Sequence, residues 1–122
     1  MNVLDTYALI EIKRGNPRYA QILQSPFLIT DLTMGEFYIV IMREENEEEA
    51  KKWRGRLKVN CRPISQEILI NGLKFRESHK RENLSIFDSV GYQYARANNF
   101  LFVTGDKAFK EKEGVLFLPA SS

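Results

Sequence analysis

The fold is decided by a stretch near the N-terminus, NVLDTYALIEIK, which covers residues 2–13. Its first three residues, Asn2–Leu4, are a short apolar run that predicts a buried strand, and the pattern from Thr6 to Lys13 predicts a helix. A strand followed directly by a helix is the repeating unit of α/β domains. Asp5 stands between the two elements, where a charged side chain beside a buried strand needs a partner.

The alternation of strand and helix continues along the chain. Parallel strands need crossover connections, which such helices supply, so we expect a three-layer α/β/α fold with a mostly parallel central sheet. No repeat, linker or low-complexity segment divides the sequence, and residues 1–122 are predicted to form one domain. Further strands are predicted at Phe27–Thr30, Val59–Ile64 (interrupted by Pro63), Phe100–Val103 and Val115–Leu118. Further helices are predicted from an N-cap at Thr33 to Glu44, at Glu47–Leu57, at Gln66–His79, from an N-cap at Ser85 to Asn98, and at Lys107–Glu111.

Composition excludes several classes of protein. The chain has 122 residues and a net charge of +2, which by itself does not indicate a nucleic-acid partner. Cys61 has no second cysteine for an intramolecular disulfide, and with His79 it cannot supply the four ligands of a structural zinc site. The longest apolar run, Phe37–Met42, is much shorter than the about 20 residues of a membrane span. Because the N-terminus also lacks a leader pattern, we expect a cytoplasmic protein.

Four acidic side chains are predicted to meet at one edge of the sheet. Asp5 and Asp106 each follow a predicted strand, and the functional crevice of an open α/β sheet lies outside the carboxyl ends of its strands. Glu36 and Asp88 each lie three residues after a predicted N-cap, in the first turn of helices that open onto the same edge. Asp31 also ends a predicted strand and competes with Glu36 for a place in the cluster.

Carboxylates that lie a few ångströms apart repel one another unless they share a cation. Sites made only of oxygen ligands suit Mg²⁺ or Mn²⁺, which are held by a few carboxylates together with substrate phosphate. Such an ion activates a water molecule and stabilises negative charge on phosphoryl oxygens. The implied reaction is therefore the hydrolysis of a phosphodiester.

Three of these acids also have a structural explanation, whereas Asp5 beside a core strand is harder to explain in this way. Thr33 with Glu36 is a complete capping box, and Ser85 with Asp88 is a looser one. Asp106 directly follows a glycine and suits a turn or an N-cap. Both explanations stay open beside the catalytic one.

Other catalytic patterns are missing or favour a structural role. Cys61 lies in an apolar stretch, which is more typical of an inert thiol than of a nucleophile paired with His79. The sequence has no G-x-S-x-G elbow, no phosphate-binding loop and no dinucleotide fingerprint. Basic residues near the acids could contact phosphates, although Lys and Arg on a helix often form only a solvated face. The candidate RNA contacts are Arg76, Lys80, Arg81 and Lys107.

Four segments carry a resemblance to a known family. They are VLDTYALIE (residues 3–11), TDLTMGEF (30–37), LSIFDSVG (84–91) and FVTGDKAF (102–109). The order and spacing of their acids resemble those of PIN-domain ribonucleases, and the chain is most similar to the VapC-type toxins of prokaryotic toxin–antitoxin pairs. The resemblance extends from Val3 to Leu118.

This resemblance implies a flavodoxin-like or Rossmann-like fold, a Mg²⁺- or Mn²⁺-dependent endoribonuclease, a homodimer and neutralisation by a cognate antitoxin. It favours Glu36 over Asp31 as a site residue. Tyr7 departs from the family pattern, because many members have Asn at this position, and the departure concerns substrate fit and packing. The residues implied for the acidic metal site are Asp5, Glu36, Asp88 and Asp106, with Thr6 and Thr104 as supporting hydroxyls.

Two alternative functions fit the same sequence. A non-catalytic PIN-fold binding module would act through a helical surface such as Phe37–Met42, whose apolar residues surround the helix. A housekeeping RNA-processing nuclease would use the same chemistry without an antitoxin. Metal binding distinguishes the first alternative, and the neighbouring reading frame distinguishes the second.

Overall fold

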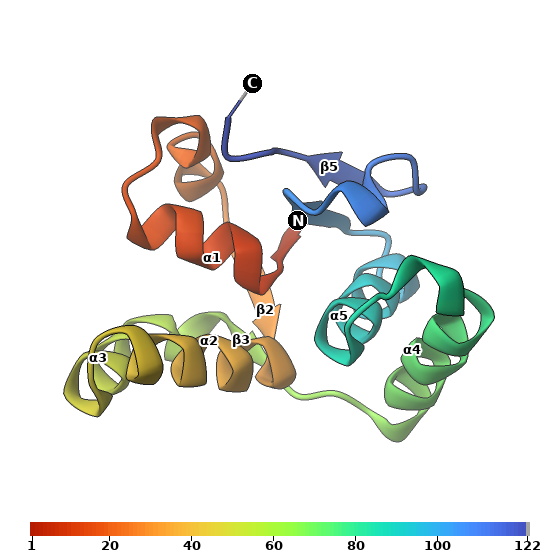
Figure 1. Cartoon of the computed structure of the whole chain (residues 1–122), viewed down its shortest axis with the longest axis horizontal. Helices are drawn as coiled ribbons and strands as arrows, with labels where there is room; N and C mark the ends of the chain where they lie inside the picture. The colour runs from red at the N-terminus through yellow and green to blue at the C-terminus, as the bar shows by residue number, and fades with distance from the viewer. Residues whose placement is uncertain (122) are drawn as a thin grey trace.

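The computed structural model describes residues 1–121, and within them the chain forms a five-stranded parallel sheet (Figure 1). The strand order is β3-β2-β1-β4-β5, so β1 pairs with β2 on one side and with β4 on the other. This confirms the expected α/β fold with a parallel central sheet. The strands are β1 (Asn2–Leu4), β2 (Phe27–Thr30), β3 (Cys61–Arg62), β4 (Leu101–Thr104) and β5 (Val115–Phe117).

The helices lie close to their predicted positions. No helix within residues 1–121 is long and apolar enough to cross a membrane. The α-helices are α1 (Thr6–Lys13), α2 (Asp31–Glu44), α3 (Glu47–Leu57), α4 (Gln66–Ser78) and α5 (Ile86–Ala97). Short 3-10 turns are η1 (Pro17–Tyr19), η2 (Ile22–Gln24), η3 (Lys58–Asn60), η4 (Lys80–Glu82) and η5 (Lys107–Phe109).

The two faces of the sheet carry separate hydrophobic clusters, which makes the fold three-layered. Successive side chains of a strand point to opposite faces. Leu4 of β1 accordingly packs with Leu9 of α1 and Phe37 of α2, all at most 1% exposed. Its neighbour Val3 packs on the other side with residues that include Tyr92 of α5. The sheet therefore has α1 and α2 on one face and α5 on the other.

Two local predictions are wrong. Helix α2 is capped by Thr30 rather than Thr33, because Thr30 ends β2 with an extended backbone and its hydroxyl accepts a hydrogen bond from the Thr33 amide at 3.1 Å. The strand predicted at Val59–Ile64 is confined to β3, because a 3-10 turn precedes it and Pro63, which has no amide proton, follows it.

The topology brings several chain segments to one edge of the sheet. Strands β2, β1 and β4 are adjacent and parallel, so their carboxyl ends meet at the same edge. Helices α1 and α2 start directly after β1 and β2. Helix α5 leads into β4, so its N-terminus opens toward the same edge. This is the edge at which the sequence predicts the acidic cluster.

Candidate active site

Asp5 ends β1 and caps α1. Its carboxylate is 1% exposed, and its Oδ1 accepts a hydrogen bond from the Ala8 amide at 2.8 Å. Its Oδ2 is also buried and makes no hydrogen bond within the described residues, and the nearby Thr104 side chain lowers the pKa of this carboxyl by less than burial raises it. Burial, followed by the negative charge of Asp88, raises the pKa of the Asp5 carboxyl well above its usual range. A buried carboxylate oxygen without a partner is costly, and it marks a place where a cation would be stabilised.

Asp88 lies in the first turn of α5. The Ser85 hydroxyl caps this helix by accepting a hydrogen bond from the Asp88 amide at 3.0 Å, as predicted. Burial raises the pKa of the Asp88 carboxyl to about 7, and the charges of Glu36 and Asp106 add to the rise. The cap explains why the helix begins here, but it does not compensate the cost of ionising this side chain among other acids.

Asp106 lies two residues beyond β4 and combines two roles. Its amide donates to the hydroxyl of the buried Thr104 at 3.0 Å, and its Oδ1 accepts from the Ala108 amide at 2.9 Å, which caps η5. The N-cap interpretation is therefore correct for this oxygen. The charge of Asp106 also contributes to the raised pKa of both Asp5 and Asp88, so it lies near both of them.

Glu36 lies in the second turn of α2, since the helix begins at Asp31. The proposed capping box with Thr33 is wrong, because Thr33 is inside the helix and Thr30 is the cap. The hydroxyl of the buried Thr6 instead donates a hydrogen bond to Glu36 Oε1. The helix-cap explanation for Glu36 is thus removed, and its side chain is held from α1.

We call Asp5, Glu36, Asp88 and Asp106 the carboxylate edge. The four come from four separate parts of the chain, and the charges of Asp88 and Asp106 act on Asp5 while those of Glu36 and Asp106 act on Asp88. Within residues 1–121, no group of three or more His, Cys, Asp or Glu side chains is close enough to hold a metal ion as the side chains stand. The donor chemistry still fits a hard divalent cation, because the donors are carboxylate oxygens and one of them, Asp5 Oδ2, is buried and unpartnered.

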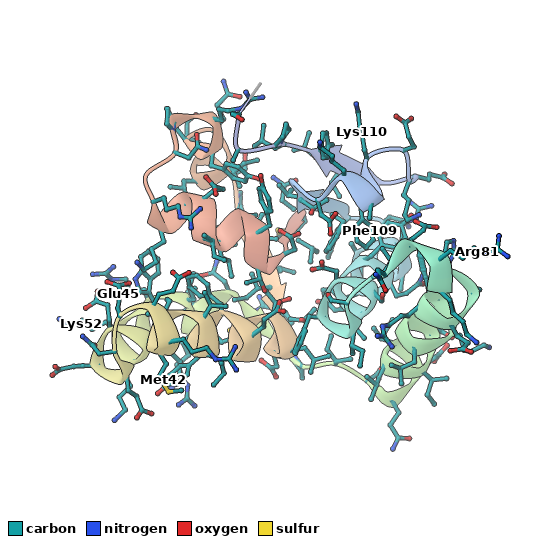
Figure 2. All side chains as sticks on the ribbon, in the orientation of Figure 1. Met42, Glu45, Lys52, Arg81, Phe109 and Lys110 are labelled. Carbon is teal, nitrogen blue, oxygen red and sulfur yellow. The ribbon has the colours of Figure 1, made fainter. Side chains whose placement is uncertain are left out.

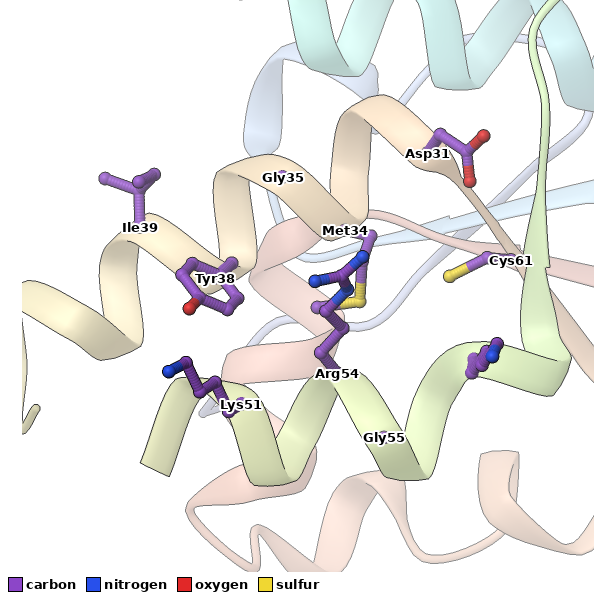
Figure 3. Close-up of a pocket in the computed structure, with 10 residues that line it drawn as sticks. Asp31, Met34, Gly35, Tyr38, Ile39, Lys51, Arg54, Gly55 and Cys61 are labelled. Atoms are coloured by element: carbon purple, nitrogen blue, oxygen red, sulfur yellow. The ribbon is translucent and has the colours of Figure 1, made fainter. Parts of the chain in front are cut away.

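Asp31 belongs to a different region. It is exposed and lines a cavity of about 870 Å³ between α2 and α3, which we call the α2–α3 cavity (Figure 3). The lining of this cavity includes Cys61 but not Glu36. Its apolar lining includes Met34, Tyr38 and Ile39, and its cationic lining is Lys51, Arg54 and Lys58.

The cations of this cavity were not predicted as a group. The sequence shows them only as charges at helical spacing next to Glu47, Glu48 and Glu49. Their separations of three and four residues place Lys51 and Arg54 of α3 on the same side as Lys58 of the following turn η3, and that spacing is the signal that could have grouped them.

The predicted RNA contacts are dispersed. Arg76 Nε donates to the Leu84 carbonyl at 2.7 Å, which ties α4 to the loop before α5. Lys80 pairs with Glu77 at 2.7 Å, both exposed, and Arg81 lies at the outer end of the α4–α5 pair (Figure 2). Only Lys107 directly follows a member of the carboxylate edge. RNA contact by these four residues stays a prediction.

Comparisons with known proteins agree with this architecture. The profile of the family described as PIN domain matches residues 3–115. A toxin–antitoxin complex from Klebsiella pneumoniae has a chain with 23% identity and a TM-score of 0.77, covering 95% of this chain and 96% of that one. VapC20 of Mycobacterium tuberculosis, described as a sarcin–ricin loop cleaving toxin, has 14% identity and a TM-score of 0.79, covering 98% and 100%.

A third similar structure is DNA-bound VapBC from Salmonella typhimurium, with 15% identity, a TM-score of 0.75 and 98% coverage of both chains. No curated protein matches the chain by sequence. At these identities the structural similarities establish the fold, and the function has to be argued from the site.

Proposed function

Because the chain belongs to the PIN domain family, we propose that it is a metal-dependent endoribonuclease and the toxin of a toxin–antitoxin pair. The observation that carries the proposal is the carboxylate edge, above all the buried and unpartnered Oδ2 of Asp5 with further acids beside it. A purely structural cluster would pair its buried charges with cations or donors. An unpartnered oxygen in a group of acids instead supports a site for Mg²⁺ or Mn²⁺.

The proposed roles follow from how each side chain is held. Asp5, Asp88 and Asp106 would hold the ion, and when bound it supplies positive charge that stabilises the phosphoryl oxygens in the transition state. Glu36, held by the Thr6 hydroxyl, orients the attacking water and accepts its proton. The water oxygen then forms its bond to phosphorus as the bond to the leaving nucleotide oxygen breaks. The Thr104 hydroxyl supports Asp106 by accepting a hydrogen bond from the Asp106 amide.

The direct test is cleavage of single-stranded RNA with Mn²⁺ or Mg²⁺, comparing the wild type with Asp5→Asn. The amide keeps an oxygen for the Ala8 cap but removes the charge. Asp31→Asn is the matched control, because it removes an exposed acid outside the carboxylate edge. Equal cleavage by Asp5→Asn and the wild type, or no cleavage by either, would refute the proposal.

We also propose that the partner is an antitoxin protein that binds at the α2–α3 cavity. The similar structures from Klebsiella pneumoniae and Salmonella typhimurium are toxin–antitoxin assemblies. Three cations surround an apolar floor there, which is complementary to an amphipathic segment with acidic side chains. In the run Phe37–Met42, Phe37 and Ile41 are core residues, whereas Ile39 is 38% exposed and lines this cavity. Homodimer formation is a further proposal, which light scattering during size-exclusion chromatography would test.

One observation favours the non-catalytic alternative, namely that no three potential ligands within the described chain are in metal-binding positions. Thermal unfolding distinguishes the two functions. A nuclease should melt at a higher temperature in Mn²⁺ than in EDTA, since an ion that binds only the folded state stabilises it. If neither Mn²⁺ nor Mg²⁺ changes the melting temperature while the product of the adjacent reading frame binds, the chain is a binding module.

A further inference from the structure

Tyr7 is in contact with the loop that carries Asp106. Tyr7 directly follows Thr6 in α1, and its ring lies against Gly105. A Cβ atom at position 105 would lie 2.0 Å from Tyr7 Cε1, so the loop approaches the ring as closely as only a glycine allows. The ring of this α1 residue thus lies against the loop before Asp106, close to the helix start that Asp5 caps.

The hydroxyl of Tyr7 is bound on its other side by the C-terminal segment, residues 118–120. Tyr7 Oη accepts a hydrogen bond from the Ala120 amide at 2.8 Å, and the Ala120 carbonyl accepts from Asn16 Nδ2 at 3.0 Å. Figure 1 shows this segment leaving β5 and running back toward the 3-10 turns that follow α1. Its position is therefore determined by contacts with the α1 side of the molecule.

The same segment is also bound to β4. The Leu118 amide donates to the Thr104 carbonyl at 2.8 Å, and the Tyr19 hydroxyl donates to the Leu118 carbonyl. Residues 118–120 consequently connect α1 and its following turns with the end of β4, two residues before Asp106. Tyr7 lies at the centre of this connection, with its ring on Gly105 and its hydroxyl on the segment.

We propose that Tyr7 is a positioning residue, which together with residues 118–120 holds the Gly105–Asp106 loop in place beside Asp5. Acids that are brought together without a cation repel one another, so a loop free to move would carry Asp106 away from Asp5. The packed ring and the bound segment prevent that movement. The consequence for metal affinity rests on the proposed nuclease function, whereas the restraint on the loop does not.

The test is a double-mutant cycle between the two partners of the hydrogen bond. Tyr7→Phe removes the acceptor and keeps the ring, Ala120→Pro removes the donor, and Ala120→Gly is the control that keeps the amide. We expect Tyr7→Phe and Ala120→Pro each to weaken Mn²⁺ binding by calorimetry about 3- to 10-fold, as expected for the loss of one hydrogen bond. The double variant should be no weaker than either single variant, because both remove the same bond.

Hydrogen exchange provides a readout that does not depend on metal. The Asp106 amide is bonded to the Thr104 hydroxyl, and its exchange in EDTA should accelerate in Tyr7→Phe. Tyr92→Phe is the matched control, because it also removes a tyrosine hydroxyl bond, of 2.6 Å to the Glu113 carbonyl, on the α5 side. It should leave both Asp106 exchange and Mn²⁺ affinity unchanged.

The two proposals fail in different ways. If no variant and not even the wild type binds Mn²⁺, the nuclease proposal fails, and hydrogen exchange still decides the role of Tyr7. Unchanged exchange at Asp106 in Tyr7→Phe would overturn that role, as would additive effects in the cycle. An equal loss of Mn²⁺ affinity in Tyr92→Phe would show that general destabilisation is the cause.

Discussion

Helix α2 contributes to two charged regions of opposite character. On one side its Glu36 joins the carboxylate edge, where like charges are crowded and Asp5 Oδ2 is buried without a partner. On the other side Asp31, Met34 and Tyr38 line the open α2–α3 cavity, together with Lys51 and Arg54 of α3 and Lys58 of η3. Unpartnered buried acids indicate a cation, whereas exposed cations around an apolar floor indicate an acidic partner. Helix α2 thus lies between the proposed site of RNA cleavage and the proposed binding site of the antitoxin.

The largest expected difference between the two regions is in catalysis. Asp88→Asn should reduce Mn²⁺-dependent RNA cleavage by about 100-fold or more, because it removes a charge from the proposed ion site. Lys58→Gln, on the wall of the α2–α3 cavity, should keep cleavage within about 2-fold of the wild type. Initial rates on a fluorescent RNA measure both variants. A loss of cleavage of similar size in the two would contradict the proposal that only the carboxylate edge takes part in catalysis.

The carboxylate edge should also make the stability of the metal-free protein depend on pH. The pKa of Asp88 is about 7 in the folded protein, against 3.8 for the free side chain, so the folded state binds more protons between these values. Stability in EDTA should therefore decrease as the pH rises from about 4 to 7, by about 2–4 kcal/mol from this group alone.

Urea unfolding at several pH values measures this slope. Asp88→Asn should flatten it in EDTA, and saturating Mn²⁺ should counteract it by binding the ionised form. A stability that increases with pH over the same window would show that the acids are compensated within the protein.

The two regions also differ in how tightly the chain packs around their glycines. Gly105→Ala should destabilise the protein by about 1–3 kcal/mol, because its new methyl group would overlap the Tyr7 ring. Gly55→Ala, in α3 beside the α2–α3 cavity, meets no atom within 4 Å and should be neutral or stabilise by about 1 kcal/mol. Chemical denaturation measures both, and the Tyr7→Ala background should relieve the effect of Gly105→Ala. Equal effects of the two substitutions would contradict the close packing of the Tyr7 ring.

The smallest expected effect concerns the partner. Arg54→Glu reverses one of three cations in the α2–α3 cavity and should weaken binding of the antitoxin, tested as the product of the adjacent reading frame, by about 10-fold. Asp88→Asn should leave that affinity unchanged. Titration calorimetry checks both, and a stronger effect of Asp88→Asn would place the partner on the carboxylate edge instead.

Much of this arrangement could be predicted because it depends on short-range patterns. The strand before Asp5, the cap at Ser85 and the turn before Asp106 are each encoded within a few residues. The error at Thr33 has a tertiary cause. Thr30 and Thr33 are both acceptable N-caps, and the pairing of β2 with its neighbours holds Thr30 in the extended conformation that a cap requires.

The sequence by itself determined the order of strands and helices, the residue types of the acidic cluster and the absence of other catalytic motifs, because periodicity, capping and composition are local properties. The tertiary structure alone decided that Glu36 is held by Thr6 and that Tyr7 meets both Gly105 and Ala120. These contacts join residues up to 113 positions apart, and such pairs are brought together by the burial of the whole core, which leaves no pattern along the chain.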